Sequence, residues 1–172
     1  MSASDRRVVR FNGLRVQFDS DKTYDELVAA LLADVGDKPV PIEDLASAAP
    51  GSWDSFAGGE VQSRVGRGDF ILLGLLDHGG WIKTAGIGRK ALRAIIGNPR
   101  IAVTMLRHDV MAGLYASVEL LVIDRDDERS SLIYVKPSSL MVVDDNPPLH
   151  EAAEELDAKV EALAAKVTGQ EE

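Results

Sequence analysis

Hydrophobic and polar residues alternate in the first well-patterned stretch of the chain, residues 7–18. The apolar positions of this alternation are Val9, Phe11, Leu14, Val16 and Phe18. Asn12-Gly13 lies in the middle of the stretch, and this pair readily takes the two positive φ angles of a type I′ turn. The stretch therefore predicts a β-hairpin with its turn at Asn12-Gly13.

A helical spacing follows the predicted hairpin. Thr23-x-x-Glu26 is a capping box, in which each side chain accepts a hydrogen bond from a backbone N–H that the first helical turn leaves free. Leu27, Ala30 and Leu31 then form one apolar face. Gly36 is predicted to end this helix in the left-handed conformation.

A longer helical pattern begins after Pro147-Pro148, where apolar residues recur at spacings of 4, 3, 4, 3 and 4. These residues are Leu149, Ala153, Leu156, Val160, Leu163 and Val167. The narrow stripe predicts a long amphipathic helix. We expect the helix to dock on its own sheet, and a two-stranded coil with another chain is the alternative.

Four apolar runs between the two helices have the length of strands. They cover residues 70–76, 91–96, 118–123 and 132–135. The third run is apolar on both faces apart from Glu119, so it is predicted to be a central strand. A charged loop joins it to the fourth run, which Pro137 ends because proline cannot donate to a strand ladder.

Residues 97–113 are compatible with two structures. Asn98 is a favoured N-cap residue and Pro99 suits the first helical position, where no amide donor is needed. On a helix that ends at Gly113, one face would contain Ile101, Met105, His108 and Ala112. The segment is also rich in residues that favour strands, so its periodicity leaves helix and strand open.

Residues 37–69 contain three prolines and five glycines, which break any long periodicity. They predict a loop-rich insertion with a short helix at 43–48 and a strand near 38–42. A loop of this length inside a compact domain is usually functional or mobile. Trp53 either pins the insertion to the core, as aromatic residues usually do, or forms part of a lid over a pocket.

Composition narrows the class of protein. A chain of 172 residues is expected to form a single domain, residues 1–172. Its 19 basic and 28 acidic residues give a net charge of −9 without a dense basic run, which argues against nucleic acid as a partner. The sequence has no cysteine, so disulfides, thiolate nucleophiles and iron–sulfur clusters are excluded.

No apolar run approaches the roughly 20 residues of a membrane span, and the first residues do not resemble a secretory signal. We expect a cytoplasmic protein without a membrane partner.

The order of several short motifs resembles the bacterial "domain of unknown function 302" family. The matching pieces are Asp77-His78, Gly86, Gly97-Asn98-Pro99, Met105-Leu106, Gly113-Leu114, the apolar run from Val118, Ser131 to Tyr134, Pro137 and the closing helix. The resemblance implies a helix after Gly97-Asn98-Pro99. It also implies a TATA-binding-protein-like α+β fold, in which a curved antiparallel sheet carries two main helices on one face. A fold name of this kind says nothing about DNA binding, and the biochemical role of the family is not established.

The sequence departs from the family pattern at two places that would affect the entrance to a site shared by the family. Residues 37–69 look like an insertion into a link that is shorter in the family. Ala116-Ser117 stands where the family commonly has Leu-Pro before the next strand.

The candidates for chemistry are few. Asp77-His78 follows a predicted buried strand, where it forms either an ordinary strand-end turn or part of a site. His108 is a second candidate, and the two histidines would form an acid–base, metal or haem site if they converged with Asp77 or Glu119. Asp124 to Glu128 lacks the spacing of a calcium loop.

An anion site is the other candidate. The helix that Asn98 begins offers free N–H groups, and Arg89, Lys90 and Arg100 lie near it in sequence. Asn98 itself is the main group expected to satisfy those donors.

Together these patterns predict a protein that binds a small apolar or anionic ligand between the sheet, a helix and residues 37–69. The expected pocket residues are Asp77, His78, Asn98, Arg100 and His108, with Trp53 on a lid. An enzyme with a histidine-based acid–base, metal or haem site is the alternative, and a protein-interaction module is the second alternative. A homodimer formed through a sheet edge or the final helix is also compatible with the sequence.

Overall fold

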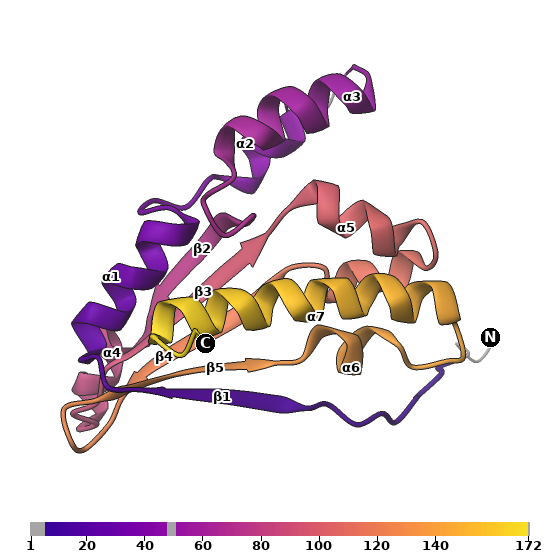
Figure 1. The fold of residues 1–172 in the computed structure, drawn as a ribbon. Helices are drawn as coiled ribbons and strands as arrows, with labels where there is room; N and C mark the ends of the chain where they lie inside the picture. Colours follow the sequence, from indigo (N-terminus) through magenta and orange to yellow (C-terminus); the bar gives the residue numbers. More distant parts are fainter. Residues whose placement is uncertain (1–5, 48–50, 172) are drawn as a thin grey trace, which may run out of the picture.

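A computed structural model describes residues 6–47 and 51–171 of the chain. Its five strands form one antiparallel sheet in the order β1-β5-β4-β3-β2, as Figure 1 shows. The strands are β1 (Arg15–Ser20), β2 (Ile71–Asp77), β3 (Ala91–Gly97), β4 (Val118–Asp124) and β5 (Ser130–Val135). The run predicted to be central, β4, is the middle strand of the sheet.

The main helices lie on one face of this sheet (Figure 1). The α-helices are α1 (Tyr24–Val35), α2 (Ile42–Ser47), α3 (Trp53–Ser55), α4 (His78–Ile82), α5 (Pro99–Leu106), α6 (Pro137–Met141) and α7 (Pro147–Thr168). Shorter helical turns are η1 (Phe56–Val61, a π-helix) and the 3₁₀ turns η2 (Gln62–Arg64), η3 (Lys83–Ala85) and η4 (Val110–Leu114). The architecture is the predicted α+β fold, a curved antiparallel sheet with α1 and α7 as the main helices. In the described part of the chain, no helix is long and apolar enough to cross a membrane.

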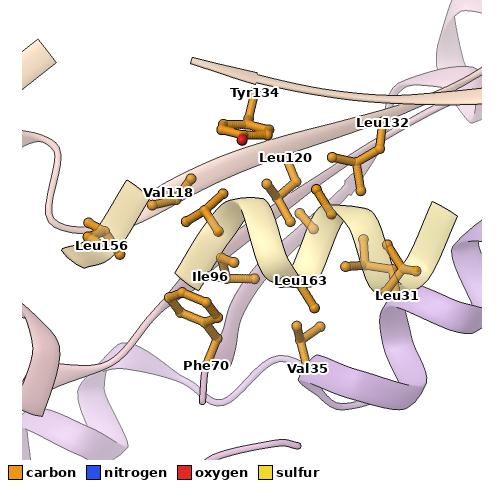
Figure 2. Packing of buried hydrophobic residues seen from close by; sticks show 14 of the residues in the cluster. Leu31, Val35, Phe70, Ile96, Val118, Leu120, Leu132, Tyr134, Leu156 and Leu163 are labelled. Atoms are coloured by element: carbon orange, nitrogen blue, oxygen red, sulfur yellow. The ribbon is translucent and has the colours of Figure 1, made fainter. Parts of the chain in front are cut away.

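The core lies between the sheet and the two main helices. Alternate residues of the central strands point toward the helices, among them Ile96, Leu120 and Leu132, which are at most 1% exposed. Figure 2 shows these side chains meeting Leu163 from α7 and Leu31 from α1. Burial of such side chains is the main favourable term in folding, at about 1.5–3 kcal/mol each.

Helix α7 docks on its own sheet, so that prediction is confirmed. All six residues of its predicted apolar stripe are buried. Two buried carboxylates next to the helix have charged partners, with Asp34 2.9 Å from Lys166 Nζ and Asp157 3.7 Å from Lys136 Nζ. Because the stripe is fully used inside the chain, α7 has no apolar seam left for a two-stranded coil.

The hairpin predicted at residues 7–18 is wrong. Only its second half forms a strand, β1, and this strand pairs with β5 rather than with residues 7–11. The Leu14 backbone instead contacts the start of α6: Lys136 N–H donates to Leu14 O at 2.8 Å, and Leu14 N–H donates to Ser139 Oγ at 2.9 Å. Long-range pairing has overridden the local turn signal of Asn12-Gly13.

The capping box of α1 is confirmed, because Thr23 N–H donates to Glu26 Oε2 and Glu26 N–H donates to Thr23 Oγ1. Gly36 ends the helix at φ +111° and ψ 150°, so its φ is positive as expected but its conformation is not the left-handed helical one. Asn98 begins α5, since its side chain accepts from Arg100 N–H at 2.9 Å. This helix ends at Leu106, before the predicted Gly113, which lies in η4.

Residues 37–69 are more helical than expected. The short helix predicted at 43–48 is present as α2, and α3, η1 and η2 follow it, but no strand forms near 38–42 within the described residues. Val40 N–H nevertheless donates to Leu72 O at 2.8 Å, and Gly66 N–H donates to Phe70 O at 2.8 Å. The insertion therefore covers the first part of the outer edge of β2, which would otherwise expose unpaired backbone groups.

Candidate functional site

The two candidate histidines lie at opposite ends of β3. His78 begins α4, directly after β2, where Asp77 pairs with Leu92 near the start of β3. His108 follows α5, which begins just after β3 ends. Figure 1 shows α4 and α5 at opposite ends of the sheet. The sequence left open whether His78 and His108 converge, and they do not, because a seven-residue strand separates them by roughly 20 Å.

Asp77 and His78 form the ordinary strand-end turn. Asp77 Oδ1 accepts from Gly80 N–H at 3.0 Å and so caps α4. His78 Nδ1 accepts from Trp81 Nε1 at 3.3 Å, and the two rings lie edge to face with centroids 6.0 Å apart. Both side chains are occupied by local contacts.

His108 is exposed at the end of α5, although Met105 and Ala112 of the same predicted face are buried. Its carbonyl oxygen accepts from Asn146 Nδ2 at 3.5 Å. In the residues that the structure describes, no group of three or more His, Asp or Glu side chains is placed to hold a metal ion.

Asn98 and Arg100 line a cavity between residues 37–69, α5 and α7, whereas the sequence predicted a pocket between the sheet, a helix and residues 37–69. This hollow, which we call the Asn98 cavity, has a volume of about 290 Å³. Asn98 is 8% exposed and has both ends of its amide in use, since its Nδ2 donates to Asp69 O at 2.8 Å. Arg100 donates to Gln62 Oε1, and Lys159 Nζ lies 2.9 Å from Asp69 Oδ2.

The cationic groups expected around an anion do not gather there. Arg89 pairs with Asp124, its Nε 2.8 Å from Oδ1, and Lys90 Nζ lies 3.3 Å from Asp25 Oδ2. The hydrogen bond that Arg89 donates to the Asp124 carboxylate raises the pKa of the Arg89 guanidinium above its ordinary value. Both cations thus belong to the opposite end of β3 from Asn98.

Trp53 does not close over any of the cavities described here. Its ring packs against Phe56 at a centroid distance of 5.8 Å, and 46% of the residue is exposed. The small cluster beneath the insertion is formed by Leu45, Val61 and Ile71, with Phe56 at its margin. The pinning role predicted for an aromatic residue therefore belongs to Phe56 rather than to Trp53.

A larger apolar cavity lies at the other end of the molecule from α4, and we call it the terminal cavity. Its volume is about 490 Å³. Four separate segments supply its walls: the N-terminal segment 7–11, η4 with the residues on either side of it, α6, and the link into α7. The apolar lining consists of Val9, Phe11, Met111, Leu114, Tyr115, Leu140, Met141, Val143 and Leu149.

Local contacts hold these walls in place. Phe11 meets Tyr115 edge to face at a centroid distance of 6.5 Å, which fixes the N-terminal segment against η4. Asp109 Oδ1 accepts from Met111 N–H at 2.9 Å and begins η4. Asn146 Oδ1 accepts from Leu149 N–H at 3.2 Å and begins α7.

The polar rim of the terminal cavity is mostly acidic. It contains Asp109, Asp144 and Asp145 against one cation, Arg7, whose Nη2 lies 3.6 Å from Asp144 Oδ2. A rim with more carboxylates than cations favours a ligand that presents a cation or N–H donors. A larger hollow of about 670 Å³, near the C-terminal end of α7, has mostly charged and polar walls and so suits an apolar molecule less well.

The sequence analysis did not find the terminal cavity. No motif marks it, because its walls come from separate segments of the chain, residues 7–11, 109–115 and 140–149. One usable signal was the presence of Val110, Met111 and Leu114 between the end of a helix and the start of a strand. These apolar residues fit neither the helical periodicity before them nor the strand alternation after them. All three are highly exposed in the structure.

Comparison with known proteins identifies the family. The model described as "Domain of unknown function DUF302" matches residues 57–167. The crystal structure of an uncharacterized conserved protein DUF302 from Bacillus stearothermophilus shares the fold, with a TM-score of 0.61 and 15% identity over 89% of this chain and 97% of that chain. No curated protein matches the chain. Since the family model matches well over half of the sequence, the chain belongs to the DUF302 family.

Proposed function

We propose that the protein binds a small, mainly apolar molecule in the terminal cavity. The observation that carries this proposal is the gathering of exposed apolar side chains on its walls. Val9, Phe11, Met111, Leu114 and Val143 are between 38% and 78% exposed. Leaving such side chains in water costs roughly 25 cal/mol per Å² of apolar area, and a bound apolar molecule would recover part of that.

The size and chemistry of the cavity support the same proposal. About 490 Å³ lies within the roughly 300–1,000 Å³ typical of small-molecule sites, and such sites combine apolar walls with a few polar groups. The acidic rim provides those groups and favours a ligand with a cationic or N–H-donating end. A cytoplasmic location, as expected from the sequence, remains part of the proposal.

The other candidate functions have less support. The amide of Asn98 and the cations around it are already paired, which weakens an anion site there. An enzyme based on His78 or His108 would have to work with one histidine at a time, because the two lie far apart. For an interaction module built on residues 37–69, the exposed large apolar side chain that the structure describes there is Trp53.

A fluorescent apolar amine, N-phenyl-1-naphthylamine, tests the proposal. Its fluorescence should rise on binding to the wild-type protein, and Leu114→Asp should weaken the binding about tenfold or more, because a charge replaces an apolar wall. Leu114 is 78% exposed, so the change should leave the fold intact. Val110→Asp is the matched control, since Val110 lies in the same turn and is 79% exposed but does not line the cavity.

The acidic rim gives a second comparison. Quinacrine, an apolar cation, should bind more tightly than the anion 8-anilinonaphthalene-1-sulfonate, and the difference should shrink as salt screens the rim. If the wild-type protein leaves all three probes unbound, or if Leu114→Asp and Val110→Asp behave alike, the terminal cavity is not the binding site.

A further inference from the structure

A second apolar hollow adjoins the terminal cavity, and we call it the side hollow. Its volume is about 310 Å³, and Leu114, Tyr115 and Leu140 line both spaces. The other walls come from the start of β4, the end of β5 and the start of α6, and they are Ser117, Val118, Glu119, Val135 and Pro137. A molecule that is longer than the terminal cavity therefore has a second apolar space beside it.

The strand register explains why the side hollow forms. Val118 of β4 pairs with β3, but the pairing of β4 with β5 starts only at Leu120, opposite Tyr134. The residue after β5, Lys136, donates its N–H to Leu14 O instead, and α6 begins at the next position. β4 and β5 therefore separate at this end of the sheet, and the side hollow lies in the fork between them.

The N-terminal segment runs along both hollows. At the terminal cavity, the ring of Phe11 packs against Tyr115. Two residues later, a methyl group at Gly13 would lie 3.5 Å from Val135 Cγ1 and 3.6 Å from Leu140 Cδ2. Gly13 thus passes within van der Waals distance of two walls of the side hollow. One length of chain borders both spaces, as expected for a single elongated groove.

The two ends of this groove differ in charge. The rim of the terminal cavity has three aspartates against Arg7. In the side hollow the charged wall is Glu119, which is already ion-paired with Arg93, and most of the other walls are apolar. An ammonium group is therefore favoured at the rim of the terminal cavity, and an uncharged chain is favoured in the side hollow.

We propose that the two hollows together hold one long-chain amine, with its ammonium group at the acidic rim and its alkyl chain running past Tyr115 into the side hollow. The inference rests on the proposed function, because the ammonium group and the first part of the chain lie in the terminal cavity. It adds the class of the ligand, an unbranched alkyl chain with a cationic end. Each CH₂ group that leaves water for the groove should raise the affinity about threefold to fourfold.

A series of alkylamines tests the length of the groove. Octylamine, decylamine and dodecylamine, each kept below its micelle concentration, are titrated into the wild-type protein by isothermal calorimetry. The affinity should rise about tenfold for every two carbons added, because each added CH₂ enters an apolar space. 1-Adamantylamine, a compact amine with ten carbons, measures binding to the terminal cavity alone.

Val135→Trp should block the side hollow without altering the terminal cavity. Val135 lines only the first of these two spaces and is 36% exposed. Dodecylamine should bind this variant about tenfold or more weakly than wild type, whereas 1-adamantylamine should bind both alike and so verify that the variant is folded. Ile133→Trp is the matched control, since Ile133 lies two residues earlier on the same face of β5, is partly exposed and lines neither hollow. Ser117→Trp repeats the block from another wall of the side hollow.

The outcomes separate this inference from the proposed function. If neither 1-adamantylamine nor any alkylamine binds the wild-type protein, both fail. If 1-adamantylamine binds but dodecylamine gains nothing over octylamine, or loses nothing in Val135→Trp and Ser117→Trp, the terminal cavity is a site and the long-chain inference is wrong. Dodecanoate has the same number of carbons and a negative end, so it should bind at least about tenfold more weakly than dodecylamine at low salt. Equal binding of the two would show that the acidic rim does not select a cation, and would overturn the inference in the same way.

Discussion

Leu120 and Leu121 are neighbours in the middle strand of the sheet and have the same side chain, yet their surroundings differ completely. Leu120 is 1% exposed and belongs to the main core under α1 and α7. Leu121 points to the opposite face of the sheet, away from α1 and α7, which we call the open face; it is partly exposed and packs on neither hydrophobic cluster. The difference shows that apolar composition on both sides of a strand does not mean that the chain itself covers both sides.

The two faces also differ in how their polar groups are used. On the covered face, the buried carboxylates Asp34 and Asp157 each have a lysine partner on or next to α7, so charge is confined to the margins of the helix. On the open face, Arg93 and Glu119 form an ion pair between Ile95 and Leu121. Charge is therefore kept at the margins of the covered face, whereas it lies among the apolar side chains of the open face.

The comparison is tested most strongly by truncating the two leucines. Leu120→Ala should lower the free energy of unfolding by about 2–5 kcal/mol, because it removes buried methyl groups and leaves a cavity. Leu121→Ala should lower it by less than about 1 kcal/mol when urea unfolding is followed at a protein concentration low enough for single chains. Equal losses for the two variants would mean that the open face is packed within the chain.

A pH test addresses the covered face through Tyr134. Burial, followed by the charges of Glu161 and Asp157, raises the pKa of Tyr134 to about 12 from an ordinary value of 10. Because the folded state resists ionisation of this phenol, stability should be constant below pH 10 and should fall as the pH rises from 10 toward 12. The loss should be about 1 kcal/mol between pH 10 and 11.

Tyr134→Phe should remove this part of the alkaline loss and leave stability near pH 7 almost unchanged. Urea unfolding of both proteins at pH 8, 10 and 11 measures the difference. If the two curves fall in parallel, other groups cause the alkaline loss and Tyr134 is not held neutral by the core.

The elements of the fold were predictable where local chemistry and periodicity agree. The capping box of α1, the apolar stripe of α7 and the N-cap role of Asn98 all appear in the structure as the sequence indicates. Each of these signals depends on residues within a few turns of one another. Local signals of this kind determine helix ends directly, because the free N–H groups of a first turn need a nearby acceptor.

Local signals misled where distant pairing competes with them. Asn12-Gly13 favours a tight turn, but the strand on its C-terminal side pairs with β5, which lies more than 100 residues away. In the insertion, Gly58 and Gly59 suggested a loop, yet the segment becomes helical because Ala57 and Val61 are buried. Tertiary packing has outweighed helix propensity in that segment.

The candidate site was only partly predictable. Asn98 and Arg100 line a cavity next to residues 37–69, but its other walls come from α5 and α7 and not from the sheet. The terminal cavity depends on four segments that meet only in the folded chain, and one sequence does not show which segments meet. The separation of His78 from His108 is likewise a matter of topology, since they flank two different strand ends.

The smallest expected effect concerns the polar margin of the open face, where β1 meets β5. Ser131 Oγ donates to Asp19 Oδ1 at 2.7 Å, and this hydrogen bond, with a second from Gln17, lowers the pKa of Asp19. A lowered pKa contributes stability that is present above the ordinary value near 3.8 and is lost as the pH falls through the folded value.

Ser131→Ala should move the pKa of Asp19 upward, while stability at pH 7 stays within about 1.5 kcal/mol of wild type. A carbon-detected NMR titration of the Asp19 carboxyl, assigned with Asp19→Asn, measures the shift. An unchanged pKa would show that Ser131 does not hold this carboxylate.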